Sequence, residues 1–238
     1  MARGKAQTLM QIAVLETDVQ TPDLLPSHGS LAAMMQAWLQ PVVPGLSVTG
    51  IAATDDATPL PDPGGFDGFV ITGSRYSAYD PEPWIARLGD YLRALHGAGR
   101  PMLGICFGHQ ILAQALGGQV ARRGWRVGLE QVSAGGLDGL GQVQAHVWHQ
   151  DQVVALPPGA RVLAAYPGCP VGALGYGQHA LSLQWHPEYP PDYMASILAA
   201  EGPAHLPAPV FRAATASLAG RHDGARVAAA AARKLGWS

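Results

Sequence analysis

The sequence predicts an α/β protein built as a three-layer sandwich, in which helices flank a central, mostly parallel sheet that carries a small antiparallel extension. In the first half of the chain, short apolar runs alternate with segments of helical spacing. Strands that are joined through helices form parallel sheets covered on both faces. In the middle of the chain, shorter apolar runs follow one another with only turns between them, which is typical of antiparallel pairing.

The first half supplies the parallel part of the predicted sheet. Apolar runs predict strands at 9–15, 46–53, 66–72 and 101–105, and apolar residues at helical spacing predict helices at 31–39, 83–96 and 107–116. Ser30 is placed to cap the first of these helices, and Pro41 and Pro44 end it. Each strand is therefore followed by a segment that can return the chain to the same edge of the sheet.

The second half supplies the antiparallel extension and a helical tail. Five shorter strands are predicted at 126–133, 142–148, 162–166, 171–175 and 180–184. The chain after Pro190 and Pro191 is alanine-rich and predicted to be helical, with a loop marked by Pro203, Pro207 and Pro209. Two amphipathic helices in this tail are expected to cover the flank of the sheet, with a subunit contact as the alternative. We expect a single domain over 1–238, with a core at 1–189 and a helical C-terminal extension at 190–238.

Composition and charge exclude several classes of protein. Hydrophobic residues make up 48% of the 238 residues and charged residues 13%, so a disordered chain is excluded. The formal net charge of −2 gives no electrostatic footprint for nucleic acid or for an anionic membrane. Arg3 and Lys5 precede the run at 9–15, which is too short for a signal sequence, and no run of about 18 apolar residues occurs. With two cysteines and no paired motif, a reducing compartment is indicated, and we expect a cytoplasmic protein.

The segment Gly104-Ile-Cys-Phe-Gly108 predicts a nucleophile. An apolar strand leads into Cys106 and a helix follows it, which is the strand–turn–helix context of a G-x-nucleophile-x-G elbow. Glycines two residues before and after relieve crowding at such a sharp turn. The backbone amides at the start of the helix favour a thiolate and can hold a developing oxyanion. The alternative is a buried structural cysteine, the commonest state of a free thiol.

A thiol nucleophile needs a base, and the base needs an orienting partner. His186 follows an apolar strand, and Glu188 lies two residues further on. In extended chain this spacing places both side chains on the same side, and Pro187 stiffens the pair. A Cys106–His186–Glu188 triad is therefore the predicted catalytic group.

Two segments resemble class I, or triad-type, glutamine amidotransferases. They are Gly104-Ile-Cys-Phe-Gly-His-Gln110 and Gln184-Trp-His-Pro-Glu188. The similarity is greatest to stand-alone proteins like the amidotransferase domain of GMP synthase. Supporting matches lie at 69–74, at 115–118 and in the H-x-D segment that begins at His149.

The resemblance implies a flavodoxin-like fold and hydrolysis of the γ-amide of glutamine. Matched position by position, Cys106 is the nucleophile, His186 the general base and then acid, and Glu188 the orienting carboxylate. Backbone amides of Gly73 and Phe107 would form the oxyanion hole, and Gln110 would contact the bound substrate. The family often has Gly-Gly-Pro at the oxyanion loop, whereas this chain has Thr72-Gly73-Ser74, which leaves the identity of the second donor open.

No cofactor and no metal are expected. His149 and Asp151 are read as a hydrogen-bonding turn in preference to a metal pair, and His205 and His222 as surface residues. The sequence contains no SGGxDS pyrophosphatase loop and no P-loop motif. A separate synthetase or acceptor subunit is therefore the expected partner if released ammonia is used, and homo-oligomerisation stays open.

Three functions remain distinct at this stage. The chain is a glutaminase or amidotransferase subunit that passes ammonia to an acceptor, or a hydrolase of γ-glutamyl peptides or conjugates with the same triad, or a non-catalytic binding or regulatory protein. The intact triad disfavours the third function. Nothing in the sequence separates the first two, because both begin with the same thioester.

Overall fold

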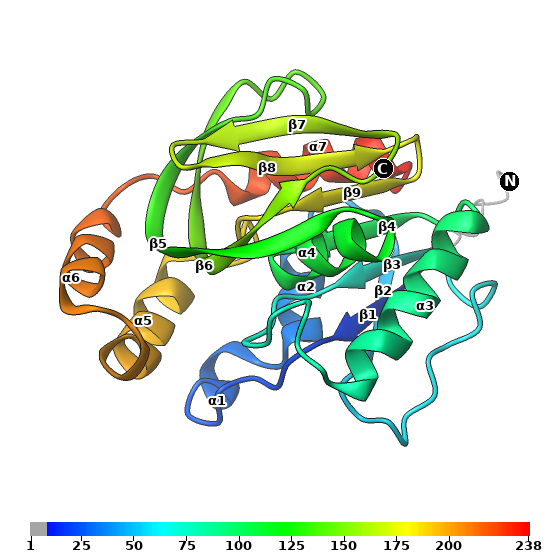
Figure 1. The fold of residues 1–238 in the computed structure, drawn as a ribbon, viewed down its shortest axis with the longest axis horizontal. Coiled ribbons are helices and arrows are strands. Elements are labelled where there is room, and N and C mark those ends of the chain that lie inside the picture. Colours follow the sequence, from blue (N-terminus) through cyan, green and yellow to red (C-terminus); the bar gives the residue numbers. More distant parts are fainter. Residues whose placement is uncertain (1–8) are drawn as a thin grey trace, which may run out of the picture.

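The computed structural model describes residues 9–238, which form seven helices and one nine-stranded mixed sheet (Figure 1). The predicted absence of a signal sequence concerns Arg3 and Lys5, which lie outside the described residues. No helix within residues 9–238 is long and apolar enough to cross a membrane.

Five parallel strands form one half of the sheet. Their order is β2-β1-β3-β4-β9, and each pair between neighbours is parallel. The strands are β1 (Met10–Glu16), β2 (Leu46–Ala52), β3 (Gly68–Ile71), β4 (Met102–Ile105) and β9 (Ala180–Leu183). Since β4 lies between β3 and β9, the chain segments that follow these three strands meet at one edge of the sheet.

Four antiparallel strands continue the sheet beyond β9 in the order β8-β7-β5-β6. They are β5 (Gln119–Ser133), β6 (Gln142–Ala155), β7 (Ala160–Tyr166) and β8 (Cys169–Tyr176). At 15 and 14 residues, β5 and β6 are much longer than predicted. The ladder between them shifts register between Arg122 and Arg126, and Gly124 within this bulge has φ +93°. The bulge accommodates Gly124, and β5 therefore begins at Gln119, before the predicted start at 126.

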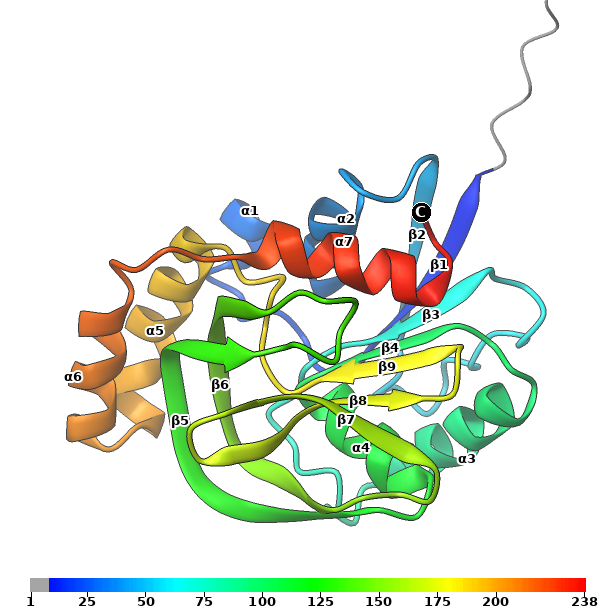
Figure 2. The ribbon, with the colours of Figure 1, turned by 90° about the horizontal axis from the view of Figure 1, so that it is seen from above.

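Helices cover both faces of the parallel strands, as predicted. On one face α2 (Leu31–Leu39) and α7 (Gly224–Leu235) pack in a core cluster with Ile12 and Val14, and Figure 2 shows both helices on the same side of the sheet. On the opposite face, Ala13 and Leu15 belong to the cluster that contains α3 (Pro83–Gly97) and α4 (Phe107–Ala115). The alternation of β1 side chains between two clusters gives the three layers.

The C-terminal residues divide between two places. The helices α5 (Pro191–His205) and α6 (Ala208–Ser217) lie at one end of the molecule beside β5 and β6, near the short helix α1 (Leu25–His28) (Figures 1 and 2). The helix α7 returns to the sheet, and its residues belong to the main core cluster. The predicted loop within the tail is present at 206–207 but is shorter than predicted, because α5 continues to His205 with Pro203 in its last turn and α6 begins at Ala208.

Candidate active site

Cys106 occupies a sharp turn between β4 and α4. Its backbone has φ 52° and ψ −102°, a conformation that a residue with a Cβ atom rarely adopts. A Cβ atom on Gly104 would lie 2.4 Å from the carbonyl oxygen of Gly108, and one on Gly108 would lie 2.3 Å from the carbonyl oxygen of Ile71. Both glycines are therefore required by close backbone approach, as the elbow motif predicts.

The turn presents the sulfur of Cys106 at the bottom of a cavity. The residue is 5% exposed and lines the cavity, and its Sγ atom donates to the carbonyl oxygen of Trp148 at 3.6 Å. The amide of Phe107 is the first of α4, so it has no intrahelical acceptor. This amide and the helix dipole place positive potential next to the sulfur.

His186 and Glu188 form a buried pair. The Nδ1 atom of His186 lies 2.8 Å from Oε1 of Glu188, and the two residues are 2% and 4% exposed. The contact that the sequence predicts is present, but a turn makes it, because the amide of Tyr189 donates to the carbonyl oxygen of His186. The ring of Tyr189 stacks on His186 at a centroid distance of 4.0 Å and fixes the plane of the imidazole.

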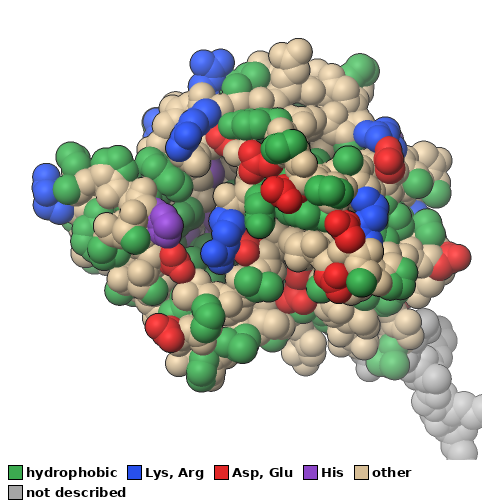
Figure 3. All heavy atoms as spheres, turned by 60° about the horizontal axis from the view of Figure 1, so that its bottom comes forward, with side chains coloured by type: hydrophobic (Ala, Val, Ile, Leu, Met, Phe, Trp, Pro, Cys, Tyr) green, Lys and Arg blue, Asp and Glu red, His purple; other side chains and the backbone are tan. Residues whose placement is uncertain are grey.

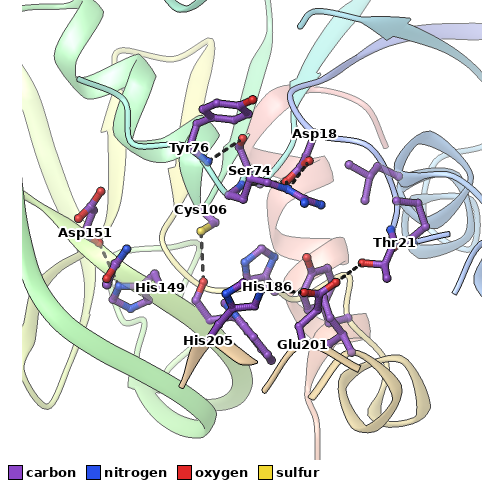
Figure 4. Close-up of a pocket in the computed structure, with 18 of the residues that line it drawn as sticks. Asp18, Thr21, Ser74, Tyr76, Cys106, His149, Asp151, His186, Glu201 and His205 are labelled. Atoms are coloured by element: carbon purple, nitrogen blue, oxygen red, sulfur yellow. Dashed lines mark hydrogen bonds and ion pairs between the residues drawn. The ribbon is translucent and has the colours of Figure 1, made fainter. Parts of the chain in front are cut away.

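The surroundings of His186 favour its charged form. Burial lowers its pKa, but the Glu188 carboxylate and the Cys106 sulfur outweigh burial and raise the pKa to about 10. The charged form of the imidazole is therefore favoured, and its other nitrogen is free to face the sulfur. Figure 4 shows Cys106 and His186 next to each other in the cavity.

The loop after β3 brings Gly73 to the same point. A Cβ atom on Gly73 would lie 2.8 Å from Cε1 of His186 and 3.6 Å from Cβ of Cys106. The loop is fixed from behind, because the Thr17 hydroxyl donates to the carbonyl oxygens of Thr72 and Gly73 at 3.0 Å. Sequence reasoning missed Thr17, whose only signal is its position just after the first strand.

Gln110 and the H-x-D segment form one wall of the cavity. The side-chain amide of Gln110 donates to the carbonyl oxygen of Asp151 at 3.0 Å. The ring of His149 bonds to that same carbonyl oxygen and to the hydroxyl of Tyr166. The Asp151 carboxylate accepts from the Ser77 hydroxyl at 2.6 Å. Both members of the pair considered as metal ligands thus have protein partners, and no group of three potential metal ligands occurs within residues 9–238.

Two histidines are predicted to be surface residues, and the structure agrees with this prediction for one of them. His222 is half-buried and stacks on His146 at 4.6 Å, where burial lowers its pKa to about 4. The expectation of a surface residue is wrong here, because the turn before α7 folds against β6. His205 is exposed as predicted, but it also lines the cavity and pairs with Glu201.

The cavity has a volume of about 380 Å³ and extends to both sides of Cys106. Figure 4 shows His149 and Asp151 on one side of the sulfur and Thr21 and Glu201 on the other, with His186 between. Of the residues that the sequence predicts for the site, Cys106, Gly73, Gln110 and His186 line the cavity, while Glu188 lies behind His186.

Comparison with known proteins places this geometry in a family. The family model "Glutamine amidotransferase class-I" matches residues 46–201, about two thirds of the chain. The chain belongs to the class-I glutamine amidotransferase family. The match includes every residue of the predicted site and ends within α5, so it leaves α6 and α7 outside.

Curated relatives match about half of this chain. Gamma-glutamyl peptidase 5 of Arabidopsis thaliana is 38% identical over 146 residues, which cover 56% of this chain and 58% of that protein. A GMP synthase (glutamine-hydrolyzing) of Parafrankia sp. strain EAN1pec is 47% identical over 127 residues, which cover 50% of this chain and 23% of that protein. The chain therefore spans less than two thirds of these curated relatives.

Solved structures extend the comparison to the whole fold. The crystal structure of a glutamine amidotransferase from Thermotoga maritima superposes with a TM-score of 0.74 at 18% identity and covers 96% of this chain and 99% of that one. At this identity the similarity shows the fold alone. The three-layer mixed-sheet arrangement, including the antiparallel strands, is thus a fold that this family already uses.

Proposed function

We propose that this amidotransferase hydrolyses the γ-amide bond of glutamine or of γ-glutamyl compounds through a thioester at Cys106. The observation that carries the proposal is the elbow at Cys106, whose sulfur faces an imidazole that Glu188 holds at 2.8 Å. The family relationship supports the choice of a γ-glutamyl amide, since relatives carry the names γ-glutamyl peptidase and GMP synthase.

The first half of the cycle forms the thioester. The Cys106 thiolate attacks the γ-carbonyl carbon, and the amides of Gly73 and Phe107 hold the oxyanion. One such donor contributes on the order of 3 kcal/mol to the stability of the transition state. His186, charged in the resting site, gives its proton to the leaving nitrogen as the C–N bond breaks.

The second half releases glutamate. Neutral His186 accepts a proton from water, which attacks the thioester, and the C–S bond breaks to restore the Cys106 thiolate beside the charged imidazole. The carboxylate of Glu188 keeps Nδ1 protonated throughout, so that Nε2 exchanges the proton. A thiol nucleophile works only while it is reduced, and for this reason we place the protein in the cytoplasm.

An assay of ammonia, amine and glutamate release across glutamine and a panel of γ-glutamyl compounds tests the proposal. The wild type is expected to hydrolyse at least one of them, and acid quenching during turnover is expected to trap one glutamyl group on the peptide that contains Cys106. Cys106→Ser is expected to lose turnover and the trapped adduct together. Turnover that persists in Cys106→Ser would remove this residue from the mechanism.

The relatives of the GMP synthase type favour a second candidate, a subunit that passes ammonia to a separate synthetase. In that case glutamine is the substrate and other γ-glutamyl compounds are poor ones. The same panel separates the two candidates, because a hydrolase of conjugates turns over substituted amides faster than glutamine.

A further inference from the structure

The position of the acid decides where the leaving group lies. His186 must reach the leaving nitrogen, so a substituent on that nitrogen passes His186 and enters the part of the cavity beyond it. In Figure 4 this part contains Thr21 and Glu201, and Asp151 lies on the opposite side of the sulfur. We call the part beyond His186 the leaving-group side. Thr21 and Glu201 lie there in Figure 4. Ile197 lies one turn before Glu201 in α5, and Arg75 is bonded to Asp18, which Figure 4 shows on the same side of the sulfur.

The cavity as a whole is much larger than ammonia. Ammonia is close in size to water, whose share of liquid volume is about 30 Å³. The cavity as a whole holds about 380 Å³, within the range of sites that take drug-sized ligands. Figure 3 shows a hollow on this face of the molecule, between the lobe of α5 and α6 and the rest of the chain.

An apolar wall borders this space. Trp125 from β5 and Trp148 from β6 line the cavity together with Tyr193 and Ile197 from α5. Trp148 and Ile197 pack against the cluster that contains Tyr193, and Trp125 packs against the cluster between α5 and α6. Fixed aromatic rings of this kind bind an apolar side chain at low entropic cost.

Arg75 supplies polar groups without a protein partner at the edge of this space. Its Nε atom donates to both carboxylate oxygens of Asp18 at 2.9 and 3.0 Å, and its backbone amide donates to Asp18 as well. Within the described residues, Nη1 and Nη2 have no hydrogen-bond partner, and the side chain is 59% exposed. Asp18 therefore holds the guanidinium from one edge and leaves the other edge open to an acceptor.

Glu201 differs from Arg75 in this respect. Its Oε1 accepts from the Thr21 hydroxyl at 2.8 Å, and its Oε2 pairs with His205 at 3.2 Å. Both carboxylate oxygens thus have protein partners, whereas two nitrogens of Arg75 have none. Arg75 thus offers a planar donor fork without a protein partner, and this geometry matches a carboxylate.

We propose that the preferred substrates are γ-glutamyl dipeptides with a large apolar second residue, whose α-carboxylate binds Arg75. The inference rests on the proposed hydrolysis and names its leaving group. The C–N bond of the γ-glutamyl amide breaks as the C–S bond to Cys106 forms, and the proton of His186 goes to the amine of the departing amino acid. Arg75 is a specificity-determining residue that touches the substrate far from the reacting bond.

Three substrates isolate the carboxylate. They are γ-glutamyl-leucine, γ-glutamyl-isopentylamide, which keeps the same side chain without the carboxylate, and glutamine. In the wild type we expect kcat/KM to be highest for the dipeptide. In Arg75→Met we expect KM for the dipeptide to rise about 10- to 100-fold, the loss typical of a charge-assisted hydrogen bond, with kcat within about twofold.

Matched variants separate recognition from structure. In Arg75→Met the KM for the dipeptide is expected to rise at least tenfold more than the KM for the isopentylamide or for glutamine, and Arg75→Lys is expected to fall between wild type and Arg75→Met for the dipeptide. Arg123→Met, an exposed arginine that does not line the cavity, is the control. An equal loss on all three substrates in Arg75→Met would assign Arg75 a structural role and overturn the inference.

Two further outcomes also decide the matter. Faster turnover of γ-glutamyl-putrescine than of the dipeptide, lost in Glu201→Gln, would show that the leaving group is a cation and overturn the inference. Calorimetric titration of γ-glutamyl-leucine into Cys106→Ala separates binding from chemistry. Binding that weakens in the double variant with Arg75→Met supports the inference even if the wild type hydrolyses nothing, a result that refutes only the proposed function.

Discussion

The charge on His186 depends on one neighbouring carboxylate. Four histidines in this region are fully or almost fully buried, and burial lowers the pKa of His109, His146 and His149, to about 3 for His109 and His149. His109 bonds to the Ser182 hydroxyl and His149 to the Tyr166 hydroxyl, and neither partner carries a charge. His186 has a carboxylate at 2.8 Å, and its pKa rises to about 10. The same residue type at the same depth is thus neutral or charged according to its partner.

Glu188→Gln tests this dependence. With the carboxylate gone, burial is opposed only by the sulfur, so the pKa of His186 is expected to fall from about 10 toward or below neutrality. The basic limb of kcat/KM, on which the imidazolium loses the proton that the leaving group needs, is expected to move to lower pH by the same amount. Imidazole carbon shifts, assigned by loss of the signal in His186→Asn, measure the pKa directly.

The control for this titration is Glu130→Gln. Glu130 pairs with Arg126 on β5 and does not line the cavity. Its removal is expected to leave both the basic limb and the His186 titration unchanged. A Glu188→Gln variant that titrates like wild type would show that the carboxylate does not set the charge of the imidazole.

The two cysteines differ in reactivity for a reason that the sequence shows only in part. The elbow glycines identify Cys106 from the sequence, but nothing there shows the state of Cys169. In the structure Cys169 is fully buried, and burial raises the pKa of its thiol to about 11. It is therefore a structural thiol, whereas Cys106 lines a cavity beside an imidazolium.

We expect iodoacetamide to label Cys106 well before Cys169. At pH 7 and short reaction times, peptide mapping by mass spectrometry is expected to find the label on the Cys106 peptide, with at least a tenfold excess. Cys169→Ser is expected to keep the wild-type labelling rate at Cys106. Labelling of both thiols at equal rates in folded protein would contradict the assignment.

At the scale of elements, the sequence correctly predicts the helices and strands whose limits are set by nearby residues. The strand before Cys106, the cap of α2 at Ser30 and the end of α4 follow from residues within a few positions. The extension of β5 through Gly124 and the continuation of α5 through Pro203 do not. Gly124 and Pro203 each disfavour the element that contains them, but long-range contacts outweigh this local effect. The strand β6 pairs with β5 across the bulge, and α6 packs on α5. The cavity wall from α5 was missed for the same reason.

The loop between β3 and α3 offers a test of how tightly the site is built. In Gly73→Ala the new Cβ atom would lie 2.8 Å from Cε1 of His186, so the imidazole must move away from the sulfur. A displacement of about 1 Å costs on the order of 100-fold in rate, and we expect kcat to fall by about this factor while the melting temperature changes little. Steady-state kinetics and calorimetry measure the two effects.

Gly97→Ala is the matched control for Gly73→Ala. Gly97 ends α3, and a Cβ atom there would meet nothing within 4 Å. This variant is expected to keep the wild-type rate and to gain a little stability from the reduced entropy of its unfolded chain. Wild-type kcat in Gly73→Ala would mean that the loop yields easily and does not position the imidazole.

At the scale of the whole molecule, the far end of the chain completes the core and the site together. The α7 residues Val227 and Ala231 belong to the core cluster that also contains Cys106. The indole of Trp38 donates to the carbonyl oxygen of Gly224, and Gln144 on β6 and Asp223 exchange two hydrogen bonds. The buried cluster thus includes residues of α7, beyond position 189. The sequence could not show this, because an amphipathic helix carries no signal for which sheet face it covers.

We therefore propose that residues 9–238 fold as one cooperative unit, and truncation tests it. A chain that ends at Gly220 loses α7 and Trp237, which packs against Gly68, and so exposes one face of the parallel strands. We expect this chain to lack a cooperative thermal transition.

Trp237→Ala, which removes less, is expected to lower the free energy of unfolding by about 3 kcal/mol. Arg233→Ala, on the exposed side of α7, is expected to change it by less than about 0.5 kcal/mol. Cooperative unfolding of a fragment of residues 1–189 at the wild-type temperature would instead show that the C-terminal helices are an appendage, since a core that lacks α7 could then close without it.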